Sequence, residues 1–157
     1  MAGDKAQDKQ DGRKPITDFA QLRDDFTTID VVIDRPDGGE LVVTVKTLSY
    51  KEWMDIERAV PMPAPPVNGA DRSGRPIYNE QDATYQRAVA DAHNERLYRR
   101  IIAALQMDVP GDTIEEQMEA IGQLDTQLVI SLGNVLTAAH LASVGRVEER
   151  ARSFRKA

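Results

Sequence analysis

The feature that most restricts the fold is a pair of alternating, β-branched segments. Residues 29–34 (IDVVID) and 41–46 (LVVTVK) alternate apolar and polar side chains, and a Pro-Asp-Gly-Gly run between them supplies a turn. The pattern predicts a β-hairpin over about 28–46 with one apolar face: Ile29, Val31, Ile33, Leu41, Val43 and Val45. Because an isolated hairpin is marginal in water, this face must pack on helices, on another strand, or on a second chain, where it would be a self-association surface.

Helical signals follow the hairpin. A Ser-x-x-Glu capping box at Ser49 and Glu52 predicts a helix that ends near Val60. Residues 61–78 are rich in Pro and Gly, which predicts an extended linker and the main internal boundary.

Three further helices are predicted after this linker. Apolar spacing indicates a long helix from about Asn79 to Leu105 and a strong helix over 126–143. Between them, a second capping box at Thr113 and Glu116 opens a shorter helix. The expected fold class is therefore α+β, mainly α, with an N-terminal hairpin, a helix, a linker and a bundle of about three helices.

The same patterns divide the chain into segments. Polar residues dominate 1–15, which we expect to be a disordered arm, and helical spacing of Phe19, Leu22 and Phe26 indicates a short helix before the hairpin. The remaining units are the hairpin with its helix (16–60), the linker (61–78), the helical domain (79–145) and a basic, frayed helical tail (146–157).

Composition restricts the function classes. The 157 residues include no cysteine, which excludes disulfides, a thiol nucleophile and Cys-ligated metals, and indicates the cytoplasm. A net charge of −6 argues against a protein that wraps nucleic acid. Basic residues at 96, 99, 100 and in the tail are the best counter-argument, but such residues near helix C-termini commonly complement the helix dipole. No apolar run is long enough for a membrane span.

No catalytic or metal-binding pattern stands out. The two histidines, His93 and His140, lack a second ligand at helical spacing, so solvated or packed imidazoles are expected. The acidic turn at Asp34, Asp37 and Glu40 does not match a calcium loop. Phosphate-binding, dinucleotide, nucleophile-elbow and metalloprotease motifs are missing. We therefore expect no enzyme activity, no metal and no cofactor.

The apolar faces of the last two helices offer two interpretations. They are a helical core, or part of them binds apolar helical segments of a partner, since Met-bearing surfaces adapt to varied sequences. The partner-binding hypothesis names these residues: Met118, Ile121, Leu128, Leu132, Val135 and Leu136.

The order of these elements resembles the tail assembly chaperones of long-tailed, siphovirus-like bacteriophages. The resemblance lies in a strand running into a capped helix, Val43-Thr44-Val45-Lys46-Thr47-Leu48-Ser49-Tyr50-Lys51-Glu52-Trp53, followed by a Pro-rich break, a long helix and a helical C-terminal half. It covers roughly residues 28–143.

This resemblance implies a non-catalytic function in virion assembly. The chain would bind the tape-measure protein in the host cell cytoplasm, keep its apolar segments soluble, aid recruitment of tail-tube protein and form a homo-oligomer. The alternatives are a structural phage virion component, such as a connector or minor tail protein, and a small helical nucleic-acid-binding regulator.

Overall fold

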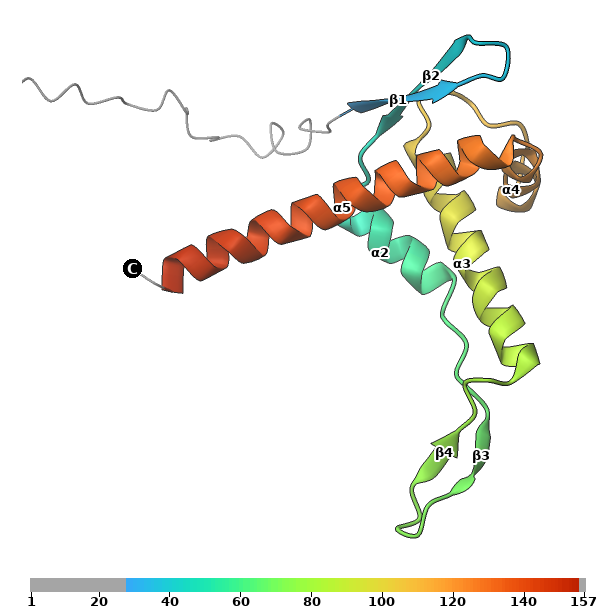
Figure 1. Cartoon of the computed structure of the whole chain (residues 1–157), viewed down its shortest axis with the longest axis vertical. Coiled ribbons are helices and arrows are strands. Elements are labelled where there is room, and N and C mark those ends of the chain that lie inside the picture. Colours follow the sequence, from blue (N-terminus) through green and yellow to red (C-terminus); the bar gives the residue numbers. More distant parts are fainter. Residues whose placement is uncertain (1–27, 156–157) are drawn as a thin grey trace, which may run out of the picture.

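The computed structural model describes the backbone of residues 28–155 and the side chains of residues 28–142 (Figure 1). The predicted arm over 1–15 and the short helix around Phe19 to Phe26 lie outside the described residues. The elements, in chain order, are β1 (Thr28–Asp34), β2 (Glu40–Lys46), α2 (Tyr50–Ala59), β3 (Val67–Ala70), β4 (Pro76–Tyr78), α3 (Ala83–Ala104), α4 (Ile114–Gly122) and α5 (Thr126–Arg155). The predicted fold class, α+β and mainly α, is confirmed.

The first hairpin has the predicted strands and faces. β1 and β2 pair antiparallel in an unbroken register that places Val31 opposite Val43 and Val32 opposite Val42. In the turn, the Arg35 N–H donates to the Gly39 carbonyl at 2.7 Å, and Gly38 adopts φ 82°, a conformation that favours glycine.

The predicted linker is corrected by the structure. Residues 67–78 form a second hairpin, β3–β4, which extends away from the other elements in Figure 1. The Asp71 carboxylate accepts hydrogen bonds from the Ser73 and Arg75 N–H groups at 2.8 and 2.9 Å, and Gly74 adopts φ 79°. The sequence interpretation weighed Pro and Gly as breakers and overlooked the turn that Asp71 can stabilise.

Helix caps decide where the helices begin. Both predicted capping boxes are present, Ser49 with Glu52 at α2 and Thr113 with Glu116 at α4. The Asp82 side chain caps α3 by accepting from the Tyr85 N–H at 2.9 Å, so this helix begins at Ala83 and not near Asn79. The sequence predicts a strong helix over 126–143 and a frayed helical tail over 146–157; in the structure both belong to one helix, α5, which continues to Arg155 and projects beyond the other elements (Figure 1).

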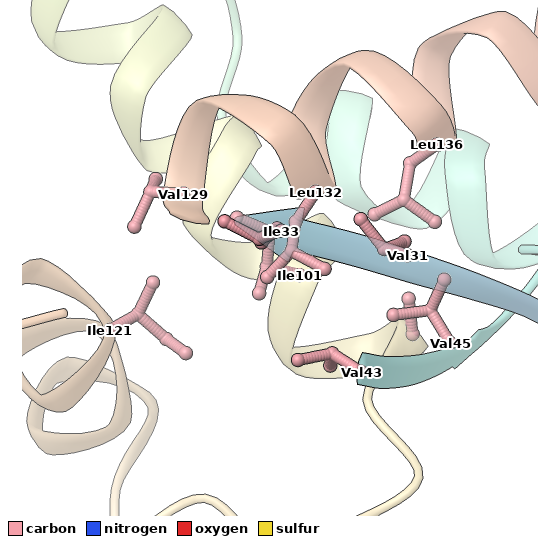
Figure 2. Packing of buried hydrophobic residues seen from close by; sticks show 10 residues of the cluster. Val31, Ile33, Val43, Val45, Ile101, Ile121, Val129, Leu132 and Leu136 are labelled. Carbon is pink, nitrogen blue, oxygen red and sulfur yellow. The ribbon is translucent and has the colours of Figure 1, made fainter. Parts of the chain in front are cut away.

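The hydrophobic core lies between the first hairpin and the helices α3, α4 and α5 (Figure 2). Its buried side chains are Val31, Ile33, Val43, Val45, Ile101, Ala104, Ile121, Val129, Leu132 and Leu136. Gly133 allows the close approach of α5 to α3, because a Cβ there would lie 2.5 Å from a Leu97 methyl group. The inner face of the hairpin is therefore covered by the chain's own helices.

Candidate functional site

Half of the predicted partner-binding residues belong to the core. Ile121, Leu132 and Leu136 are only 2, 1 and 3% exposed, and Figure 2 shows Leu132 and Leu136 pointing toward the hairpin. Leu128 and Val135 are partly buried and pack against this cluster. A partner could reach Leu132 and Leu136 only if α5 separated from the hairpin, and Ile121 is equally buried on α4. These three side chains are therefore not an accessible partner surface in the folded chain.

Met118 lies on an open surface. It is half-buried and lines a groove of about 510 Å³ between α3 and α4, together with Asp91, Asn94, Glu95, Tyr98, Glu119, Gly122 and Gln123. Three carboxylates in this lining make the groove acidic. Met118 is therefore a predicted partner-binding residue on an open groove, whereas Ile121 lines a smaller cavity of about 110 Å³ and is itself only 2% exposed.

A second groove, between α2 and α3, is much more apolar. It has a volume of about 370 Å³ and a floor of Ile56, Ala59, Ile102, Ala103 and Ile114, with Glu52, Asp55 and Arg99 at its rim. We call it the apolar groove. None of its five floor residues belongs to the fully buried core, so their side chains remain within reach of a partner.

The charges at the rim of the apolar groove are paired with neighbours. Lys46 Nζ lies 2.7 Å from Glu52 Oε1, and Arg99 Nη2 lies 2.8 Å from Glu95 Oε1. Asp55 pairs with Lys51. Because these ionic groups already have partners, the groove offers an apolar floor with little net charge at its edge, which suits apolar side chains better than an ionic ligand.

A network of ion pairs holds α2 against α3 and so fixes the shape of the groove. The Glu57 carboxylate pairs with both Arg96 and Arg100. Arg96 Nε also donates to the carbonyl of Val60, the C-cap of α2, at 2.8 Å. Burial lowers the pKa of the Arg100 guanidinium, and Glu57 opposes this shift. Arg96 and Arg100 are thus engaged inside the protein and are poorly placed to bind phosphates.

An aromatic contact joins α5 to α2. The rings of Trp53 and His140 stack with centroids 3.8 Å apart and planes 2° from parallel, and the Arg100 guanidinium carbon lies 3.9 Å from the centroid of the Trp53 ring. His140 is therefore a packed imidazole, while His93 is exposed. Within the described residues, no group of three or more His, Cys, Asp or Glu side chains could hold a metal ion.

Sequence reasoning missed the apolar groove because it combines three distant segments. Ile56 and Ala59 lie on the helix predicted after Ser49, but which helix packs beside it depends on Glu57, whose partners Arg96 and Arg100 are 39 and 43 residues further along the chain. No local pattern indicates that pairing. The available signal was an acidic residue, Glu57, in the last turn of one helix and the basic residues at 96 and 100 on another, and such residues are usually solvated.

Glu52 lies at the rim of the groove and also belongs to the capping box of α2. Its pKa therefore leads to a prediction of how stability depends on pH. Burial raises its pKa, but hydrogen bonds from Lys46 and from the Ser49 N–H and hydroxyl outweigh burial, so the pKa lies below its ordinary 4.5. A carboxylate with a lowered folded-state pKa stabilises the protein above the ordinary pKa, and this stabilisation disappears as the pH falls through the folded-state value.

We therefore expect Glu52→Gln to lower the free energy of unfolding by about 0.5–1 kcal/mol at pH 7 and to make less difference as the pH falls below 4.5. Urea unfolding of both proteins across this pH range measures the effect. A difference that stays constant with pH would show that the ionised carboxylate contributes nothing.

No helix in residues 28–155 is long and apolar enough to cross a membrane. Comparison with protein-family models, curated protein sequences and solved structures finds no match to this chain.

Proposed function

We propose that this chain is a non-catalytic tail assembly chaperone of a long-tailed phage, which binds apolar helical segments of the tape-measure protein and aids recruitment of tail-tube subunits. The observation that carries the proposal is the apolar groove between α2 and α3, whose floor is aliphatic and whose rim charges are already paired. An amphipathic helix recognises such a groove through apolar side chains at positions i, i+3, i+4 and i+7.

The construction of the groove supports repeated use on different client segments. Its walls are α2 and α3, which are held together by the Glu57 ion pairs and by the hydrogen bond from Arg96 to the Val60 carbonyl, and Ile114 of α4 adds to its floor. The floor is therefore preformed, and little ordering is needed on binding. Its floor is made of Ile and Ala side chains, which present no polar group that a client would have to match. Low chemical selectivity suits a protein that must cover many segments of one long client.

A structural virion component is the second candidate, and the β3–β4 hairpin favours it. Every residue of both strands is exposed, including Val67, Ile77 and Tyr78. Exposed apolar side chains on a projecting element are typical of lasting protein contacts. Phosphate binding has less support, because Arg96 and Arg100 are occupied by Glu57.

Co-expression with the tape-measure protein encoded in the same phage genome tests the proposal. We expect the soluble fraction of the tape-measure protein to rise several-fold when this chain is present, because its apolar segments are then covered. Equal solubility with and without the chain would contradict the proposal. Mass spectrometry of purified particles separates the two candidates: a chaperone is missing from them, whereas a structural component is retained.

A further inference from the structure

The outer edge of β1 is an unpaired strand edge. Among the described residues, β1 pairs only with β2 in a two-stranded sheet, and the pairing runs over seven residues without a bulge. Natural edge strands are commonly protected by proline, bulges, charged side chains or a covering segment. β1 contains neither a proline nor a bulge, and among the described residues no other strand pairs with its outer edge. Asp30 and Asp34 place carboxylates on this edge, so a partner strand must offer neutral or basic residues opposite them.

The hydrogen-bonding pattern of the hairpin identifies these free groups. The Arg35 N–H bonds to the Gly39 carbonyl, and bonded and non-bonded pairs alternate along an antiparallel ladder. Ile29, Val31 and Ile33 therefore bond to β2, and the backbone groups of Asp30 and Val32 face outward. A partner strand must place its own outward-facing positions opposite these two.

We propose that this edge binds β1 of a second copy, giving a four-stranded antiparallel sheet with a two-fold axis through Val31. In this register Asp30 lies opposite Val32 of the second copy, and Thr28 lies opposite its Asp34.

Two other registers keep the same backbone groups facing each other. A shift by two residues in one direction places Asp30 opposite Asp34 of the second copy, and a shift by two in the other direction places Asp30 opposite the second copy's Asp30. Both shifted registers bring carboxylates together, which is unfavourable. A shift by one residue would place the outward-facing backbone groups of one copy opposite residues of the other copy whose backbone groups already bond to β2.

The residues of β1 indicate that its partner strand is β1 of a second copy. β1 is self-complementary in this register, because its outward carboxylates meet Val and Thr, and its inward residues meet each other. The Asp30 carboxylate accepts a hydrogen bond from the Thr44 hydroxyl at 2.6 Å, which holds it toward β2 and away from the new seam. Across the seam, Ile29 and Ile33 of the two copies would extend the covered apolar face.

This proposal revises how the hairpin takes part in self-association. Val31, Ile33, Val43 and Val45 are buried under the chain's own helices, so the hairpin face is not free for a second chain. The β1 edge is a different part of the same element, and it needs no separation of the core. The proposal is independent of the client-binding function, because the apolar groove is built from α2, α3 and α4.

Charge substitutions at an exposed position test the seam in the full-length chain. Val32 and Val42 are 55 and 54% exposed and lie opposite each other in the hairpin, but only Val32 meets the second copy. Val32→Asp places a carboxylate opposite Asp30 of the second copy twice per dimer, so we expect a dissociation constant raised about tenfold or more. Val32→Lys faces the same carboxylates and should keep the dimer, and Val42→Asp is the matched control.

Sedimentation equilibrium over a range of concentrations gives the dimer constants, and circular dichroism confirms that each variant is folded. The proposal is supported if the wild type, Val32→Lys and Val42→Asp all form dimers and the Val32→Asp dimer is weaker. A monomeric wild type overturns it and would indicate that the edge is covered by another part of this chain. Equal weakening by Val32→Asp and Val42→Asp overturns it as well.

Oxidative cross-linking tests the register, because the chain has no native cysteine. In the proposed sheet, directly opposite residues have Cα atoms about 5.5 Å apart, within disulfide range, whereas diagonal neighbours lie about 7–8 Å apart. The double variant Asp30→Cys/Val32→Cys should therefore form covalent dimers, and Val32→Cys alone should not. Efficient cross-linking of Val32→Cys alone would overturn the assigned register.

Discussion

Replacing Leu132 with alanine is expected to lower the free energy of unfolding by about 2–5 kcal/mol, the usual cost of removing a fully buried leucine. The Leu132 side chain is 1% exposed and lies in the core between α5, α3 and the first hairpin (Figure 2). The loss combines the apolar contacts of the removed atoms with the cavity left behind. Urea unfolding followed by circular dichroism measures it.

Leu141→Ala is the matched control for this substitution. Leu141 lies on the same helix but is 62% exposed, so we expect its replacement to change stability by no more than about 0.5 kcal/mol. Leu132→Asp should prevent folding, because an uncompensated carboxylate would be buried. If Leu132→Ala kept full stability and instead lost binding to the tape-measure protein, Leu132 would be an interface residue and the core assignment would be wrong.

The double variant Ala59→Arg/Ala103→Arg is expected to remove most binding of the tape-measure protein, with a loss of about tenfold or more in the amount that co-purifies. Two bulky cations would fill the apolar groove and make an apolar client helix bury charge. Both sites lie near helix C-termini, where a basic residue is tolerated by the helix dipole. Pull-down from co-expressing cells measures the effect.

Ala70→Arg/Ala138→Arg is the matched control for the groove, because it adds the same charges at exposed positions on β3 and α5. We expect it to co-purify the client as the wild type does. If the half-buried Ala103 makes the first variant unstable, Ala59→Arg alone keeps the test valid, since Ala59 is exposed at the end of α2. Equal binding by the groove variant and the control would contradict the assignment of the groove.

Local features of this fold could be predicted from the sequence. The hairpin register follows from apolar residues at every second position on each side of a Pro-Asp-Gly-Gly turn, and both capping boxes form as predicted at Ser49 and Thr113. These devices act over two to six residues, so they need no knowledge of the tertiary structure. The same reasoning failed at residues 67–78, where a turn centred on Asp71 organises a hairpin among Pro and Gly residues.

The candidate site could not be predicted in the same way. Apolar spacing showed that Leu132 and Leu136 share a helix face, but it could not tell whether that face meets the chain's own hairpin or a partner. The structure shows that the hairpin covers it. The apolar groove, in contrast, depends on Glu57 reaching Arg96 and Arg100, and such long-range pairing leaves no periodic signal in the sequence.

Hydrogen–deuterium exchange of the full-length chain, alone and in complex with the co-expressed tape-measure protein, tests the client-binding site most directly. Binding in the apolar groove should slow exchange in α2 over residues 52–59 and in α3 over residues 99–103, and leave β3–β4 unchanged. Protection confined to β3–β4, or an unchanged exchange rate over both groove segments, would contradict the account.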